Sequence, residues 1–198
     1  MSFGLKFYKI SRQLCDKLVN VALRGGFHRF GSRSILAMPF RSGNEHRISV
    51  GNEVFVGPGS WIQVVSDNCP GTDPVIFLDD GVSISGDCTI TAVRRVTIGK
   101  GALIARFVHI SDHSHGTADP QVPIKSQALS NIAAVTIGEG AWLGHGVVIC
   151  PGVSIGRNAV IGANSVVRDD VPDGCVAVGA PARIVRRPDS FASTAENR

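Results

Sequence analysis

The sequence predicts an all-β solenoid, in which short strands and tight corners repeat around one aliphatic core. An aliphatic residue recurs every six positions over residues 137–167, and this period fits neither an α-helix nor the two-residue alternation of a simple strand. Small residues follow most of these aliphatic positions, and the same period recurs earlier in the chain. The six aliphatic positions are Ile137, Leu143, Ile149, Ile155, Ile161 and Val167. Stacked coils of this kind bury a continuous column that no single repeat could bury alone.

Composition and charge agree with one globular domain. The chain has 198 residues, of which 43% are hydrophobic and 18% charged, which excludes a disordered chain. No apolar run approaches the ~20 residues that span a bilayer. Glycine is frequent (23 residues) and aromatic residues make up only 6%, so we expect an aliphatic core with many turns. The five cysteines are odd in number and form no CxxC pair, which argues against a disulfide framework or a thiolate zinc site and predicts a cytoplasmic location.

The first part of the chain is basic. Residues 1–41 hold eight Lys or Arg against the single acid Asp16, so this segment carries more positive charge than the whole chain, whose net charge is +4. The remainder is slightly acidic, so no nucleic-acid surface is predicted. Within the N-terminal segment 1–30, apolar residues at three- and four-residue spacing predict an amphipathic helix over residues 3–23. We expect this helix to pack against the solenoid or another chain; peripheral contact with a membrane is the alternative.

The six-residue period also shows where the solenoid is interrupted. Earlier runs of the period cover residues 50–62, 78–90 and 98–110. Residues 63–77 contain two prolines and a glycine and predict a loop, and two extra residues predict a bulged corner at 93–95. The largest interruption is the polar, turn-rich segment 111–135. A loop of that length in a compact domain is usually either functional or disordered. Residues 188–198 predict a disordered tail.

With these repeats the sequence resembles the hexapeptide-repeat acyltransferases, over about residues 48–187. Their fold is a left-handed parallel β-helix with three hexads per coil, and the resemblance, not the repeat itself, implies the handedness. It also implies a homotrimer with active sites in grooves between subunits. The implied stacks place Ile137 on Ile155, Leu143 on Ile161 and Ile149 on Val167.

The long loop opens with the motif ISDHSHG, which ends at Gly116. A neutral imidazole can take the proton of a hydroxyl at neutral pH, and the oxygen can then attack a thioester directly. ISDHSHG followed by DPQVPI resembles the sugar O-acetyltransferase branch of the family, including colanic-acid and O-antigen acetyltransferases. The resemblance implies that His115 is the general base and that His113 and Asp112 orient or polarise it.

The resemblance also implies where the two substrates bind. Related galactoside and maltose acetyltransferases present an asparagine to the acceptor hydroxyl, and the matching position here is Ser85, with Asp87 nearby. The family binds acetyl-coenzyme A, the expected co-substrate, along the later coils. The implied cofactor-binding residues are Trp142, Gly144, Ala163, Arg168 and Arg183. Asp169 departs from the pattern, because relatives often carry lysine there.

We therefore predict an acetyl-coenzyme A-dependent O-acetyltransferase that acts on a hydroxyl of a saccharide or glycoconjugate, with no metal. Two other classes of function stay open. One is a metal-dependent lyase of the γ-carbonic anhydrase type, because the His-x-His pair with Asp112 could also bind zinc. The other is a trimeric scaffold without activity. An amine in place of the acceptor hydroxyl is also compatible with the resemblance.

Overall fold

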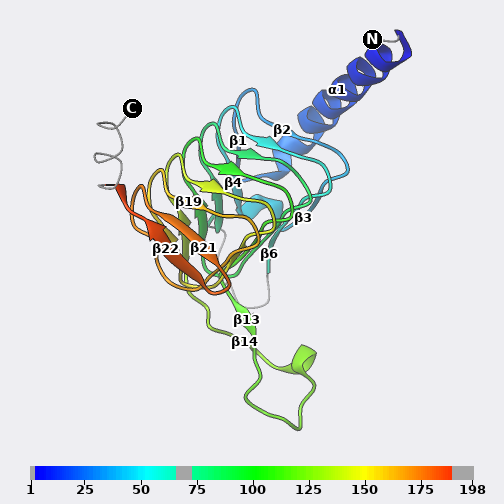
Figure 1. The fold of residues 1–198 in the computed structure, drawn as a ribbon. Helices are drawn as coiled ribbons and strands as arrows, with labels where there is room; N and C mark the ends of the chain where they lie inside the picture. The colour runs from blue at the N-terminus through cyan, green and yellow to red at the C-terminus, as the bar shows by residue number, and fades with distance from the viewer. Residues whose placement is uncertain (1–2, 66–72, 189–198) are drawn as a thin grey trace, which may run out of the picture.

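The structure is a computed structural model that describes residues 3–65 and 73–188. The predicted tail beyond Pro188 and part of the predicted loop 63–77 lie outside the described residues. The chain winds into stacked coils with a helix at one end and a narrow hairpin loop projecting from the side (Figure 1). Each coil contributes one short strand to each of three parallel sheets, here named A, B and C. The left-handed parallel β-helix predicted from the resemblance is confirmed.

Sheet A consists of six strands, each paired in parallel with the strand one coil away. They are β1 (Arg29–Phe30), β4 (Ile48–Val50), β7 (Ile76–Leu78), β10 (Val96–Ile98), β15 (Val135–Ile137) and β18 (Ser154–Ile155). Sheet C also has six strands. They are β3 (Arg41–Gly43), β6 (Trp61–Val64), β9 (Thr89–Ala92), β12 (His109–Ser111), β17 (Val148–Ile149) and β20 (Val166–Val167).

Sheet B has eight strands because a final antiparallel hairpin, β21–β22, extends it. The strands are β2 (Ile35–Leu36), β5 (Phe55–Val56), β8 (Ser83–Ile84), β11 (Leu103–Ile104), β16 (Trp142–Leu143), β19 (Val160–Ile161), β21 (Val176–Gly179) and β22 (Ala182–Arg186).

The strand register confirms the stacking that the resemblance implies. Ile137 pairs with Ile155, Leu143 with Ile161 and Ile149 with Val167. These side chains point inward and are buried. The aliphatic positions of the sequence period therefore form continuous columns through the coils, and burial of this apolar surface is the main stabilising contribution to the fold.

One coil precedes the first hexad predicted from the sequence. Phe30, Leu36 and Ser42 lie in register with Val50, Val56 and Ile62 of the next coil. The six-residue spacing therefore begins at Phe30, but the polar Ser42 hides it from a search for aliphatic residues. The short 3-10 helix η2 (Glu45–Arg47) then leads into β4.

The predicted N-terminal helix is observed as α1 (Phe3–Leu23), followed by the 3-10 turn η1 (Arg24–Gly26). Two side chains fix it to the first coil. The Asn20 amide donates to the carbonyl of Leu36 (2.9 Å) and accepts from the Leu36 N–H (2.8 Å). The Asp16 carboxylate accepts from the N–H of Met38 (3.1 Å). The helix therefore satisfies backbone groups at the open edge of sheet B, as a further strand would.

Two kinds of corner matter for the site. The BC corners join sheet B to sheet C, and the CA corners join sheet C to the next strand of sheet A. The predicted bulge at 93–95 is a CA corner between β9 and β10, and the long loop leaves the coils at the following CA corner. That loop contains the two-stranded hairpin β13 (Ser114–His115) and β14 (Leu129–Ser130) and the 3-10 turn η4 (Ile124–Ser126).

Candidate active site

Asp112 fixes the point at which the long loop leaves the coils. Its side chain is fully buried. One carboxylate oxygen accepts the N–H of Val93 (2.9 Å), and the other accepts the N–H groups of Arg94 and Arg95 (both 2.7 Å). Three converging N–H groups in a bulged corner favour an anionic acceptor, and the carboxylate of the next coil supplies it. The bulge and the loop therefore form one unit.

His113 completes this unit. Its Nδ1 lies 2.8 Å from Oδ1 of Asp112, and its side chain is only 11% exposed. Burial by itself would raise the pKa of Asp112, but the hydrogen bonds from His113 and from the three N–H groups outweigh burial and hold that pKa below its ordinary value. An ionised Asp112 can accept a hydrogen bond from Nδ1 of His113, and Nε2 is then the ring nitrogen that does not contact the carboxylate.

His115 lies beyond this pair, in β13, and its side chain is exposed. The hairpin holds its backbone, because His115 pairs with Leu129 and its carbonyl accepts from the Ser130 hydroxyl (3.0 Å). Within residues 3–65 and 73–188, no hydrogen bond joins the His115 ring to His113 or Asp112. Asp112 and His113 thus bond to each other and hold the segment that leads to His115.

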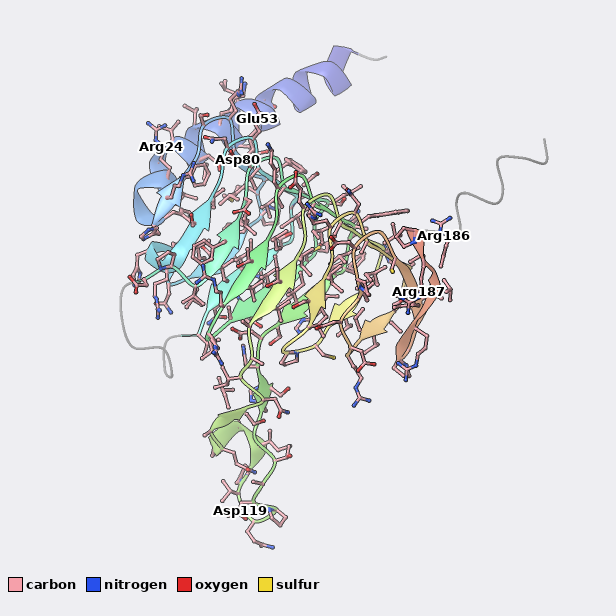
Figure 2. The ribbon with its side chains drawn as sticks, turned by 90° about the vertical axis from the view of Figure 1, so that its left-hand side faces the viewer. Arg24, Glu53, Asp80, Asp119, Arg186 and Arg187 are labelled. Carbon is pink, nitrogen blue, oxygen red and sulfur yellow. The ribbon has the colours of Figure 1, made fainter. Side chains whose placement is uncertain are left out.

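The outer part of the loop stands away from its own coils. Figure 2 shows Asp119 near the far tip of the projection. Gln127 orders this tip: its amide accepts from the Asp119 N–H (3.1 Å) and donates to the carbonyls of Asp119 and Val122 (both 2.8 Å). Val122 and Ile124 remain exposed there.

His109 is a residue near the site that the sequence analysis did not select. It lies on the outward face of β12, immediately before the buried Ile110. The pKa of His109 is lowered, first because the surrounding protein displaces water from its ring and then because the His113 imidazole is close. The sequence could have indicated His109, because it lies at an outward position of the strand that leads into the ISDHSHG motif.

The predicted acceptor residues lie at a BC corner, one coil before the loop. Ser85 is exposed, and Asp87 is half-buried. The Asp87 carboxylate accepts from Nε of Arg106 (3.0 Å), and a second contact joins it to Nη2 of the same guanidinium. Asp87 therefore forms an ion pair with an arginine of the next BC corner, and the pair is open to solvent.

Three of the predicted cofactor-binding residues lie together on later coils. Trp142 points outward from β16 and is 48% exposed. Gly144 and Ala163 follow at successive BC corners, and a Cβ added at Gly144 would lie 2.8 Å from the Ala163 nitrogen. Gly144 is buried, so its lack of a side chain lets the two coils pack closely at this corner, while Trp142 and Ala163 remain exposed.

The two predicted arginines lie at the far end of the β-helix. Arg183, in β22, donates to the Asp169 carboxylate (3.2 Å) across exposed surface. Arg168 is exposed beside Asp169, in the CA corner after β20. The aspartate that departs from the family pattern is thus the ion-pair partner of Arg183. In the described part of the chain, no cluster of three or more His, Cys, Asp or Glu residues is arranged to bind a metal.

Sequence comparison finds the same family. Residues 134–169 match the family described as "Bacterial transferase hexapeptide (six repeats)". The chain is 31% identical to galactoside O-acetyltransferase of Escherichia coli over 204 residues, covering 94% of this chain and 88% of that protein. It is also 40% identical over 120 residues to the putative lipopolysaccharide biosynthesis O-acetyl transferase WbbJ of Escherichia coli, covering 57% of this chain. The match spans 61% of WbbJ's length.

Solved structures show the same architecture. A hexapeptide-repeat acetyltransferase from Vibrio cholerae, in complex with acetyl coenzyme A, is 27% identical with a TM-score of 0.56, covering 86% of this chain and 77% of that one. The N-acyltransferase AntD from Bacillus cereus superposes with a TM-score of 0.72 at 17% identity, covering 87% and 90%, and supports the fold alone. The repeats, the coils and the galactoside O-acetyltransferase match together show that the chain belongs to the hexapeptide-repeat acyltransferase family.

Proposed function

We propose that the chain is an O-acetyltransferase that moves the acetyl group of acetyl-coenzyme A to a hydroxyl of a saccharide or glycoconjugate. The observation that carries this proposal is the histidine segment at the base of the loop, where a buried Asp112 holds His113 and the exposed His115 follows in a hairpin. The family to which the chain belongs and the named sugar acetyltransferases among its relatives support the same reaction class.

In the proposed reaction, His115 is the general base. Its exposed imidazole takes the proton of the acceptor hydroxyl as the oxygen attacks the thioester carbonyl carbon. The carbon–sulfur bond then breaks, the acetyl group stays on the acceptor oxygen, and the proton passes to the departing coenzyme A thiolate. We assign positioning to Asp112 and His113, because His113 is 11% exposed and its Nδ1 is bound to the carboxylate.

The donor and acceptor are proposed to approach from the BC corners. Trp142, Gly144 and Ala163 would line the pantetheine groove, since Trp142 and Ala163 are exposed on neighbouring coils that Gly144 allows to pack closely. Arg168 and Arg183 would meet the phosphates of coenzyme A. Ser85 and Asp87 would contact the acceptor. The acetyl coenzyme A bound to the Vibrio cholerae relative supports the choice of donor.

We also propose that the active form is a homotrimer. Outward side chains of sheet B lie in register as an apolar column that Ser83 interrupts between Phe55 and Leu103, and Phe55, Leu103 and Trp142 are each more than 40% exposed. An exposed apolar surface of this kind indicates an interface. Light scattering should give a mass of about three times 20.9 kDa. A monomer at micromolar concentration would contradict both the assembly and a site shared between subunits.

We propose a cytoplasmic location, which the four described cysteines support because all are free thiols. Peripheral membrane contact would involve α1, where Leu14, Leu18 and Val21 are each at least 57% exposed on a basic helix. None of the described helices is long and apolar enough to span a membrane. Flotation with anionic liposomes, comparing the full chain with Leu18→Asp, tests this contact, and equal flotation of both would argue against it.

The experiment that tests the function is thiol release from acetyl-coenzyme A with a panel of saccharides, followed by mass spectrometry of the products. Transfer to a sugar hydroxyl supports the proposal, and transfer to an amino sugar would assign an amine acceptor. Zinc retained after purification, together with carbon dioxide hydration and no thiol release, would support the lyase. An intact trimer with neither activity would support the scaffold.

A further inference from the structure

Phe107 adopts a backbone conformation that is unfavourable for a large side chain. Its φ is +61°, in the left-handed region, where a bulky residue is an outlier. The next two BC corners place Gly146 (φ +68°) and Asn164 (φ +58°) at the equivalent position, and both residue types tolerate this region well. A hydrogen-bond ladder from Phe107 to Gly86, Gly146 to Arg106 and Asn164 to His145 shows that the positions are equivalent.

Packing within this chain does not explain why this strained position holds an aromatic residue. Phe107 is 53% exposed. Its ring meets His145 edge to face at 5.2 Å, and the guanidinium carbon of Arg106 lies 5.4 Å from the ring centroid. The ring is therefore oriented from two sides while much of its surface stays open to solvent. Strained residues of this kind are concentrated at functional sites.

The place of Phe107 in the fold relates it to the expected acceptor residue Asp87 and to one end of the expected pantetheine groove. On one side, Arg106 joins it to Asp87, the expected acceptor residue. On the other side, His145 adjoins Gly144 in the expected pantetheine groove. Two residues further along the chain, His109 begins the strand that leads to the loop histidines.

We propose that Phe107 is the platform on which the acceptor sugar binds. This inference rests on the proposed function. A pyranose presents an apolar face of C–H groups, which packs against the electron-rich face of an aromatic ring. Asp87 can accept hydrogen bonds from the sugar hydroxyls, and Arg106 can donate to them, so an apolar surface lies beside a polar pair. The corner therefore selects ring-form sugars over linear alcohols.

The test is Phe107→Gly, measured with a pyranoside and with a linear polyol as acceptors. Glycine suits the left-handed conformation, so the variant should fold, with a Tm within about 3 °C of the wild type. The KM for the pyranoside should rise about tenfold, while the KM for acetyl-coenzyme A and the rate with the polyol stay unchanged. Phe107→Tyr should restore the wild-type KM.

The matched control is Glu53→Gly, which relieves the same strain (φ +57°) at an exposed corner between sheets A and B. Its kinetic constants should equal those of the wild type. An unchanged pyranoside KM in Phe107→Gly would overturn the inference, as would equal losses with both acceptors or dissociation of the oligomer. A wild-type protein that releases no thiol with any acceptor would instead refute the proposed function itself.

Discussion

The stacked coils and the projecting loop are stabilised by different forces. Inside the coils, side chains such as Ile98, Ile104 and Leu143 are fully buried in continuous aliphatic columns. The loop has no such core: it depends on the Asp112 carboxylate at its base, the backbone pairing of its hairpin and the Gln127 amide near its tip. We therefore expect stability and activity to depend on different regions of the molecule. Substitutions in the columns should lower stability, and substitutions in the loop should lower activity.

The largest expected effect is loss of turnover in the loop without loss of the fold. His115→Ala should lower kcat by about 10²–10⁴-fold, because a general base contributes that much to proton transfer. Its Tm and circular dichroism spectrum should match the wild type, since the side chain is exposed. His113→Ala should cost less than His115→Ala, because we assign it to positioning.

His46, exposed in η2 and outside the proposed site, supplies the control, and His46→Ala should keep full activity. If His113→Ala abolished turnover while His115→Ala retained it, His113 would be the base, with Nε2 as the acceptor of the proton. Retention of activity in both variants would exclude direct attack assisted by this loop.

The opposite behaviour is expected in the coils. Ile98→Ala removes a fully buried side chain that stacks between Leu78 and Ile137, and it should lower the free energy of unfolding by about 2–5 kcal/mol. Thr97→Ala, on the outward side of the same strand, should change that free energy by no more than about 0.5 kcal/mol. Urea unfolding at pH 7 measures both. Equal effects would mean that the columns do not dominate stability.

The coils could be predicted well because each inward position of a coil needs an aliphatic side chain, and the sequence shows those residues directly. An aliphatic residue every six positions identifies the columns, and stacks such as Ile137 on Ile155 followed from the family geometry. The sequence did not predict the coil that begins at Arg29, because the polar Ser42 occupies its third inward position. Its register depends on backbone pairing, which tolerates a polar side chain at the end of the β-helix.

The site was predicted less completely, for a physical reason. ISDHSHG identified the loop histidines, but the carboxylate of Asp112 bonds to N–H groups at 93–95, and backbone donors leave no mark in the sequence. Phe107 and His109 were also not predicted. His109 is notable for its outward orientation and Phe107 for its backbone φ, and both properties are defined only once the chain is folded.

Asp112 connects the two regions, so its removal should produce an intermediate effect. Asp112→Asn keeps the size of the side chain but replaces an acceptor for three N–H groups by an amide. It should lower the free energy of unfolding by about 1–3 kcal/mol at pH 7. The pKa of Asp112 is lowered in the folded protein. Its contribution is therefore fully present above its unfolded pKa of about 3.9 and is lost as the pH falls through the folded value.

Urea unfolding of the wild type and of Asp112→Asn from pH 7 to pH 3 measures this effect. The difference between the two proteins should shrink on the acidic side of pH 4. A difference that stays constant with pH would show that the carboxylate acts through its shape alone. A difference near zero at pH 7 would show that the bulged corner does not depend on it.

The smallest expected effect concerns the outer surface of the coils, where one substitution can change both stability and substrate binding. Trp142 is 48% exposed, so Trp142→Ala should lower the free energy of unfolding by less than Ile98→Ala, which removes a fully buried side chain. Loss of one aromatic contact with the donor should raise the KM for acetyl-coenzyme A by about 3- to 10-fold and leave kcat unchanged, as expected for an interaction made equally in the ground and transition states.

Leu103→Ala is the matched control, because Leu103 lies in register with Trp142 and is 45% exposed. If only Trp142→Ala raises the KM, the coil surface binds the donor while the loop supplies the base. If both variants raise it equally and the oligomer weakens, the apolar column of sheet B acts through subunit contact, and the donor groove must lie elsewhere.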